Sequence, residues 1–158
     1  MGKKKQKDAP ESLAENRRAR HEYHFVAEYE AGMSLLGSEV KSVRDRKISL
    51  AEAFCQFRGD ELFLMQAHVA EYTNAHARNH EPLRPRKLLL RRKELEVIRD
   101  QVRKEGLTVV PTRVYLKDRR IKLGLAVARG KKLYDKRAAI RARDEKREMD
   151  RARRERGD

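Results

Sequence analysis

Two histidines and one cysteine are the residues of this chain whose types and spacing suggest metal binding or catalysis. His76 and His80 have the i, i+4 spacing of a helical metal pair, but their segment has the composition of a loop and contains no second ligand cluster. Cys55 lies in an apolar stretch, where a buried structural thiol is favoured over a nucleophile. A metal-dependent hydrolase using the two histidines stays open as an alternative, and we expect no catalytic residue, metal or cofactor.

The carboxylates offer no better catalytic candidate. Glu28, Glu30 and Glu39 could supply an acid and a base, but nothing in their spacing distinguishes two of them from ordinary ion-pair partners. The sequence also lacks a phosphate loop, a dinucleotide-binding glycine fingerprint and a serine elbow. We therefore expect a binding protein and not an enzyme.

Basic segments that also contain amides and aromatic rings are the stronger signal. The segment NRRARHEY, residues 16–23, can bind phosphates through its arginines while its amide and rings read or stack on bases, as in the binding of non-helical RNA. A solvated run of charges is the alternative. The candidate RNA-binding residues of this segment are Asn16, Arg17, Arg18, Arg20, His21 and Tyr23.

A second basic segment, RPRKLLLRRKE, residues 84–94, surrounds an expected helix start. Cations at such a start oppose the helix dipole by about 0.3–1 kcal/mol each, and a bound phosphate reverses this penalty. Lys87 and Arg91 therefore join the candidate RNA-binding residues.

The composition supports a nucleic-acid partner. The chain of 158 residues has 40 Lys and Arg against 25 Asp and Glu, a formal net charge of +15. Its apolar runs are far shorter than the roughly 20 residues of a membrane span, and no signal peptide is visible. We expect a cytoplasmic protein without membrane contact, and a monomer.

The distribution of hydrophobic residues predicts three parts. A folded body over residues 14–130 holds nearly all large apolar residues, between a disordered basic arm over 1–13 and a basic tail over 131–158. The tail is rich in good helix formers, with helical ion pairs worth only about 0.2–0.5 kcal/mol each. We expect it to be mostly unfolded when free and helical when bound.

Hydrophobic periodicity in the body predicts mainly β structure. Alternation indicates strands over 23–32, 107–116 and 120–128, and FCQF and LFLM indicate a hairpin with Gly59 in its turn. A short strand is expected through Leu35 and Leu36. Pro111 requires an edge strand or a bulge.

Two helices and a long loop complete the predicted body. Leu36, Val40 and Val43 indicate a short helix capped by Ser38, and outward-facing Lys41 and Arg44 join the candidate RNA-binding residues. Residues 71–87 read as a long loop, and 88–106 as a helix that stops at a glycine. About six strands with two to three helices favour an OB-fold-like antiparallel barrel.

Several segments together resemble the SsrA-binding protein family, also called small protein B. The resemblance rests on NRRARHEYHF, EAGMSLLGSEVKSVR, RKLLLRRKEL and GLAVARGKKLYDKR, in that order, and covers residues 16–137. It implies a protein that binds the tRNA-like domain of transfer-messenger RNA and delivers it to stalled ribosomes for trans-translation. Elongation factor Tu would be an indirect partner, through the RNA.

The resemblance also implies roles for single residues of the body. Asn16, Glu30 and Leu89 match the family's RNA-contact positions. Asn16 would donate to and accept from a base or ribose, while Glu30 would accept from a base amine or orient a neighbouring Arg or Lys. Leu89 would offer an apolar surface to an unstacked base, with core packing as the alternative.

For the tail, the resemblance implies the empty mRNA channel and decoding centre of the stalled ribosome. Tyr134 stands where some relatives have His, which keeps stacking and removes a role for a protonated imidazole. The implied ribosome-binding residues are Gly130, Lys131, Lys132, Tyr134, Asp135, Lys136, Arg137, Arg141, Arg147 and Arg151.

A general structured-RNA-binding or ribosome-assembly protein with a basic extension is the alternative function. It predicts similar affinity for unrelated structured RNAs. Competition by bulk tRNA therefore separates the two hypotheses.

Overall fold

The elements of the chain are those of a mainly β protein. The computed structural model describes residues 10–75, 78–131 and 133–155, with only the backbone of 133–140. Its strands are β1 (Glu11–Glu15), β2 (Tyr23–Met33), β3 (Ile48–Ser49), β4 (Phe54–Arg58), β5 (Glu61–Met65), β6 (His68–Val69), β7 (Arg86–Leu89), β8 (Thr108–Lys117) and β9 (Arg120–Gly130). Its helices are α1 (Arg17–Glu22), α2 (Gly37–Arg44), α3 (Arg92–Glu105) and α4 (Leu133–Glu155).

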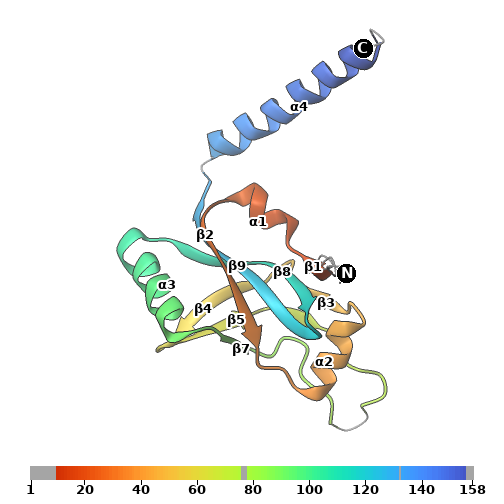
Figure 1. The fold of residues 1–158 in the computed structure, drawn as a ribbon, viewed down its shortest axis with the longest axis vertical. Helices are drawn as coiled ribbons and strands as arrows, with labels where there is room; N and C mark the ends of the chain where they lie inside the picture. Colours follow the sequence, from red (N-terminus) through yellow and green to blue (C-terminus); the bar gives the residue numbers. More distant parts are fainter. Residues whose placement is uncertain (1–9, 76–77, 132, 156–158) are drawn as a thin grey trace, which may run out of the picture.

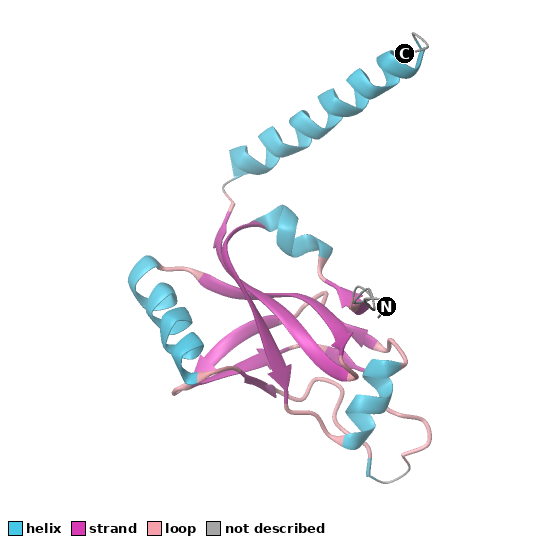
Figure 2. Cartoon of the chain, viewed as in Figure 1, coloured by secondary structure: helices cyan, strands magenta, loops and turns pink. Residues whose placement is uncertain are grey.

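Six of the strands close into a ring (Figures 1 and 2). The hydrogen-bonded order runs β8–β4–β5–β7–β2–β9, and β9 pairs with β8 again. Strand β1 pairs with residues 113–116 of β8, beyond the single β4–β8 pair at Val109, and β3 pairs with β6 in a separate two-stranded sheet. Every pairing is antiparallel, so the prediction of a mainly antiparallel β fold is confirmed.

The core fills the interior of this ring. Alternate residues of β9 point inward, and Leu123, Leu125 and Val127 are at most 1 % exposed. The intervening Ala126 and Ala128 are also buried, because α1 covers the outer face of β9 through Ala19. The far end of β9 is therefore covered on both faces, which fixes α1 against the sheet.

Several predicted elements are confirmed at the residue level. β4 and β5 form the expected hairpin, with Gly59 in the left-handed region at φ 61°. α3 ends at Gly106, whose φ of 64° gives the left-handed helix stop. The register of β8 shifts between Pro111 and Arg113, so the proline does lie at a bulge.

Other boundaries were wrong. Leu35 and Leu36 lie outside any strand, and Leu36 precedes α2 at its N-cap position, so Ser38 is not the cap. Leu88 and Leu89 belong to β7 and not to the following helix. No helix was expected at residues 17–22, where α1 forms between β1 and β2.

The two chain ends also differ from expectation. Residues 11–13, assigned to a disordered arm, pair with β8 as part of β1, and residues 1–9 lie outside the described chain. The tail forms α4, which projects from the body at the end opposite α2 (Figure 1). Disorder of the free tail is therefore not confirmed.

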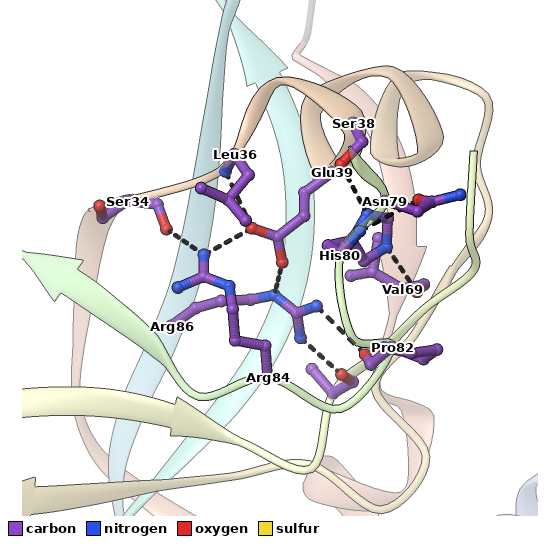
Figure 3. Close-up of polar contacts among 11 residues, drawn as sticks. Ser34, Leu36, Ser38, Glu39, Val69, Asn79, His80, Pro82, Arg84 and Arg86 are labelled. Atoms are coloured by element: carbon purple, nitrogen blue, oxygen red, sulfur yellow. Dashed lines mark hydrogen bonds and ion pairs between the residues drawn. The ribbon is translucent and has the colours of Figure 1, made fainter. Parts of the chain in front are cut away.

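A buried ion-pair network joins α2 to β7 (Figure 3). Glu39 and Arg86 are both fully buried, and Arg86 Nε donates to Glu39 Oε2 at 2.5 Å. Arg84 Nη2 donates to Glu39 Oε1 at 2.5 Å, and the Leu36 amide donates to the same oxygen at 2.8 Å. Arg86 also donates to the carbonyls of Ala67 and Pro82, at 2.7 and 3.1 Å. Every charge in the network thus has a hydrogen-bonded partner.

A second set of contacts holds the loop between β6 and β7 (Figure 3). His80 is 3 % exposed, and its ring nitrogens lie 2.9 Å from Ser38 Oγ and 2.9 Å from the Val69 carbonyl. Because the carbonyl only accepts, Nε2–H donates to Val69, and in the neutral ring Nδ1 then accepts from Ser38. The Asn79 side chain bonds both backbone groups of Tyr72. The described part of residues 71–85 is a loop, as predicted, but it is anchored to the body, and Arg86 and Lys87 of the predicted loop belong to β7.

Substituting Glu39 should destabilise the fold strongly. Glu39→Ala leaves Arg86 buried without its carboxylate, and such losses amount to about 3–5 kcal/mol. Urea unfolding at neutral pH measures the change. Glu61→Gln is the matched control, because the Glu61–Lys87 pair is about half exposed and worth about 0–1 kcal/mol. Equal losses in both variants would contradict the role of the buried pair.

The same network makes a prediction about pH. Burial acts to raise the pKa of Glu39, but the hydrogen bonds from Arg84, Leu36 and Arg86 outweigh burial and hold this pKa below 4.5. Because the folded-state pKa is lower than the unfolded one, the stabilisation is present above pH 4.5 and lost as the pH falls toward the folded value. Glu39→Gln removes this titrating group, so the free energy of unfolding should fall less steeply below pH 4.5, as measured by urea unfolding at a series of pH values.

Candidate nucleic-acid interface

An open groove crosses the outer face of the sheet beside α1. It consists of two adjoining hollows, of about 430 Å³ and 310 Å³, which share Glu28, Thr112 and Arg113. We call this feature the outer groove. The α1 hollow is also lined by Glu15, Asn16, Arg17 and Arg20. The second hollow is also lined by Tyr29, Glu30, Tyr115, Gly124 and Leu125.

Asn16 is fixed at the α1 end of the groove by the bulge in β8. Its Nδ2 donates to the Pro111 carbonyl at 2.9 Å, and its backbone N–H donates to the Thr112 carbonyl at 2.8 Å. Its Oδ1 accepts no hydrogen bond from any residue that the structure describes. That oxygen is the part of the side chain that can still accept from a base or a ribose.

The arginines of α1 divide between two sides of the helix. Arg17 and Arg20 line the groove, and the Arg20 guanidinium lies 5.6 Å from the centre of the Phe25 ring. Arg18 lies instead near Glu22 and Glu52, at 3.7 and 3.9 Å, in exposed ion pairs. The structure thus places two of the three predicted arginines in the groove.

The other predicted residues of this segment lie outside the groove lining. His21 Nδ1 lies 3.3 Å from Arg143 Nη2 of α4. Tyr23 is half-buried against the small cluster beneath α1. Neither side chain lines either hollow of the outer groove.

Glu30 anchors the polar end of the groove. The Tyr115 hydroxyl donates to Glu30 Oε2, and Lys117 Nζ lies 3.3 Å from the same oxygen. The hydrogen bond from Tyr115 lowers the pKa of Glu30, so the carboxylate is ionised at neutral pH. Burial and the neighbouring carboxylate raise the pKa of Tyr115, which keeps its hydroxyl protonated as a donor. Glu30 therefore orients a lysine, one of the two arrangements expected for it.

Arg113 and Tyr115 are groove residues that the sequence did not reveal. The Arg113 guanidinium lies 4.4 Å from the centre of the Tyr115 ring, which suits a cation–π contact. Arg113 is exposed, so it presents both a charge and a flat surface to the groove. The only sequence signal was the bulge-forming Pro111 two residues earlier.

Gly124 allows β8 and β9 to approach closely beneath Arg113. A Cβ atom at this position would lie 2.8 Å from Thr112 Oγ1 and 3.3 Å from Arg113 Cγ. It also faces Glu30 in the β2–β9 ladder. Glycine is therefore required here by space and not by backbone angles.

The remaining body candidates lie beside the groove or apart from it. Leu89 of β7 is 51 % exposed and pairs with Gly32 of β2, so it is a surface residue next to the Glu30 strand. Lys87 pairs with Glu61 at 2.7 Å, and Arg91 is the exposed N-cap residue of α3. Lys41 and Arg44 are on α2, at the opposite end of the body from α1 (Figure 1).

The start of the tail is bound to α1. Gly130 pairs with Tyr23, and the Lys131 N–H donates to the Glu22 carbonyl at 2.8 Å. Lys131 Nζ donates to the Arg20 carbonyl at 3.1 Å, so this lysine satisfies carbonyls at the C-terminal end of α1.

The other tail candidates continue from there. Lys132 lies outside the described residues, and Tyr134, Asp135, Lys136 and Arg137 are placed by backbone alone on α4. The exposed candidates further along α4 are Arg141, Arg147 and Arg151.

The histidine alternative gains no support from geometry. His76 lies outside the described residues, and both ring nitrogens of His80 are already hydrogen-bonded. Within the described ranges, His, Cys, Asp and Glu form no group of three that could hold a metal ion. Burial raises the pKa of Cys55, which disfavours the thiolate that a nucleophile needs.

The described helices show no membrane-spanning character. None of them is both long and apolar enough to cross a bilayer.

Comparisons with known proteins give a consistent result. A family model described as "SmpB protein" matches residues 13–155. The SsrA-binding protein of Thermobifida fusca (strain YX) is 46% identical, over 99% of this chain and 99% of its own. That of Chloroflexus aggregans is 50% identical, over 89% of each chain. A chain from the solved structure described as "tmRNA-SmpB: a journey to the center of the bacterial ribosome" is 42% identical, with a TM-score of 0.63, over 80% of this chain and 93% of that one.

Gly124→Ala should disturb the groove and lower stability. The added methyl group meets Thr112 Oγ1, and such overpacking costs about 1–3 kcal/mol. Thr112→Ala in the same chain removes the opposing hydroxyl and should restore most of the loss in urea unfolding. Gly37→Ala is the control, because nothing lies within 4 Å of its added Cβ. A failure of Thr112→Ala to rescue would contradict the close-approach explanation.

Proposed function

The chain belongs to the SmpB family of SsrA-binding proteins, and we propose that it binds the tRNA-like domain of transfer-messenger RNA and delivers it to stalled ribosomes. It is an RNA-binding protein of trans-translation and not an enzyme. Transfer-messenger RNA and the ribosome are its partners. Elongation factor Tu would join through the RNA, and the protein would act as a monomer in the cytoplasm.

The outer groove is the observation that carries the proposal for the body. It combines the arginine charges of Arg17 and Arg20, the open acceptor of Asn16 and the exposed guanidinium of Arg113, which rests on the buried Tyr115 ring. Cations bind phosphates, while a flat, exposed guanidinium group can also stack on an unpaired base. A folded RNA with exposed loops, such as a tRNA-like domain, supplies both kinds of partner.

Carboxylates in the same groove favour bases over phosphates at particular positions. Glu28 and Glu30 lie between the arginines of α1 and Lys117. An ionised carboxylate repels phosphate and accepts from base amines, so it restricts how RNA can lie across the face. The six-strand ring that carries the groove supports an OB-type barrel, a fold that often binds nucleic acid through its outer strands.

For the tail, we propose that α4 probes the empty mRNA channel and decoding centre. Its described side chains, from residue 141 onward, are all exposed, and Arg141, Arg147 and Arg151 are among its many cations. A slender basic helix fits a channel lined by rRNA phosphates. Among its described side chains, Arg143 contacts the body at His21, and the exposed cations further along the helix stay available to RNA.

A general structured-RNA-binding or ribosome-assembly role is the second candidate. It would not require the mixed charges of the groove. Bulk tRNA should compete well in that case and poorly if the protein is specific for transfer-messenger RNA.

Arg17→Gln combined with Arg20→Gln should weaken binding of transfer-messenger RNA and make it less salt-dependent. Each lost phosphate contact reduces the log–log salt slope by about 0.7–0.9. Filter binding over a series of KCl concentrations measures both quantities. Arg103→Gln with Lys104→Gln, on the last turn of α3, is the charge-matched control. Identical effects of the two double variants would show that only total charge matters.

Truncation after Lys131 should separate the two proposed surfaces. The shortened chain keeps the contacts of Lys131 with α1 and should retain RNA affinity, whereas tagging by stalled ribosomes should be lost. Binding assays and a reconstituted tagging reaction measure the two activities. If affinity fell as severely as tagging, the separation into body and tail functions would be refuted.

A further inference from the structure

Two arginines occupy backbone positions that favour glycine. Arg46 has a φ of 61° and Arg119 a φ of 65°, both in the left-handed region. Arg46 follows α2 in a Schellman motif, with Arg46 N–H bonded to the Val43 carbonyl at 3.0 Å and Lys47 N–H to that of Ser42 at 3.0 Å. Glycine is the usual residue at that position.

Arg119 likewise has a positive φ, in the turn of the β8–β9 hairpin. Asp118 and Arg119 form the two-residue turn between Lys117 and Arg120, the last pair of the β8–β9 ladder. Both turn residues have positive φ, which is the geometry for which Asn-Gly or Asp-Gly is strongly preferred. Arginine therefore replaces the residue that would suit the backbone better.

These two turns lie side by side. Arg44 Nη2 of α2 donates to the Arg119 carbonyl at 3.2 Å, which holds the end of α2 against the hairpin. We call residues 44–47 and 117–120 together the basic edge. It lies at the end of the body opposite the start of α4 (Figure 1).

Charge at the basic edge is only partly neutralised. The two stretches read RDRK and KDRR, so Asp45 and Asp118 are its only acids. Glu11 pairs with Arg46 at 2.9 Å, and Glu30 holds Lys117 at 3.3 Å. Four exposed cations form no ion pair with any described residue, and these are Arg44, Lys47, Arg119 and Arg120.

We infer that the basic edge is a second RNA contact, which grips the phosphate backbone beyond the outer groove. Lys117 belongs to the edge and contacts Glu30 of the groove, so one RNA can extend from base contacts in the groove to phosphate contacts at the edge. An arginine at a position of positive φ costs backbone strain that a glycine would avoid, and in return it places a positive charge at that turn. The inference deepens the proposed function and rests on RNA being the ligand.

RNA fits the edge better than an anionic membrane does. All eight residues of the edge are charged, so it has no apolar side chain that could enter a bilayer. Phosphates spaced along an RNA strand can meet the separate turns, with Arg46 exchanging Glu11 for a phosphate.

Arg119→Gly in the full-length protein gives the sharpest test, because stability and binding should change in opposite senses. We expect an equal or higher Tm, since glycine suits a φ of 65°, together with a several-fold weaker affinity for transfer-messenger RNA. The salt slope should fall by about 0.7–0.9. Arg119→Lys should keep most of the affinity. Arg120→Gln removes a neighbouring charge at a strand position and should weaken binding without a gain in Tm.

Arg103→Gln, on α3, is the control and should leave affinity near that of the original protein. Unchanged binding by Arg119→Gly and Arg120→Gln would overturn the inference, as would an equal loss in Arg103→Gln. Loss of binding to phosphatidylserine-containing vesicles without loss of RNA binding would overturn it in favour of a membrane. If Arg17→Gln with Arg20→Gln has no effect while the edge variants do, the groove assignment fails and the edge stands.

Discussion

The buried contact between Glu39 and Arg86 is the constraint on which closure of the ring depends. β7 is a short strand, and it pairs with β5 and with β2 through only two residue pairs on each side. Such short ladders add little stability by themselves. Arg86 belongs to this strand and is held from α2 by Glu39, while its other nitrogens bind the Ala67 and Pro82 carbonyls. An ion pair that is expensive to bury thus fixes a weakly paired segment of the sheet, and with it the position of Leu89 beside β2.

The chain has 40 Lys and Arg against 25 Asp and Glu, so several carboxylates each bind more than one donor. Glu39 satisfies two arginines in the interior, and Glu30 fixes both a tyrosine hydroxyl and a lysine at the surface. Each carboxylate therefore determines the geometry of several donors instead of cancelling one charge. Most of the remaining cations are left exposed, which is the state in which they attract an RNA and release its counterions.

The sequence predicted those parts of the structure that depend on local patterns. The β4–β5 hairpin, the glycine stop of α3 and the bulge at Pro111 follow from turn chemistry and were confirmed. Helix α1 was missed because it buries one residue, Ala19, and shows no apolar period. The groove was predicted in part, through Asn16, Arg17 and Arg20, whereas Arg113 and Tyr115 were not. Tyr115 meets Glu30 across 85 positions of sequence, and no local pattern reveals such a contact. Arg84 and Arg86 were counted with a phosphate-binding segment, but their partner is internal.

Lys131 couples the position of the tail to that of α1. It ties the first residue after β9 to the last turn of α1, so a movement of α1 also moves the point from which the tail leaves the body. The 23 residues of α4 span roughly 35 Å at 1.5 Å per residue. A tilt of α1 by about 10° would sweep the far tip of such a rod through roughly 6 Å. Were α4 to follow α1 as a rigid rod, a small adjustment of α1 around RNA would displace the far tip of α4 by about the rise of one helical turn.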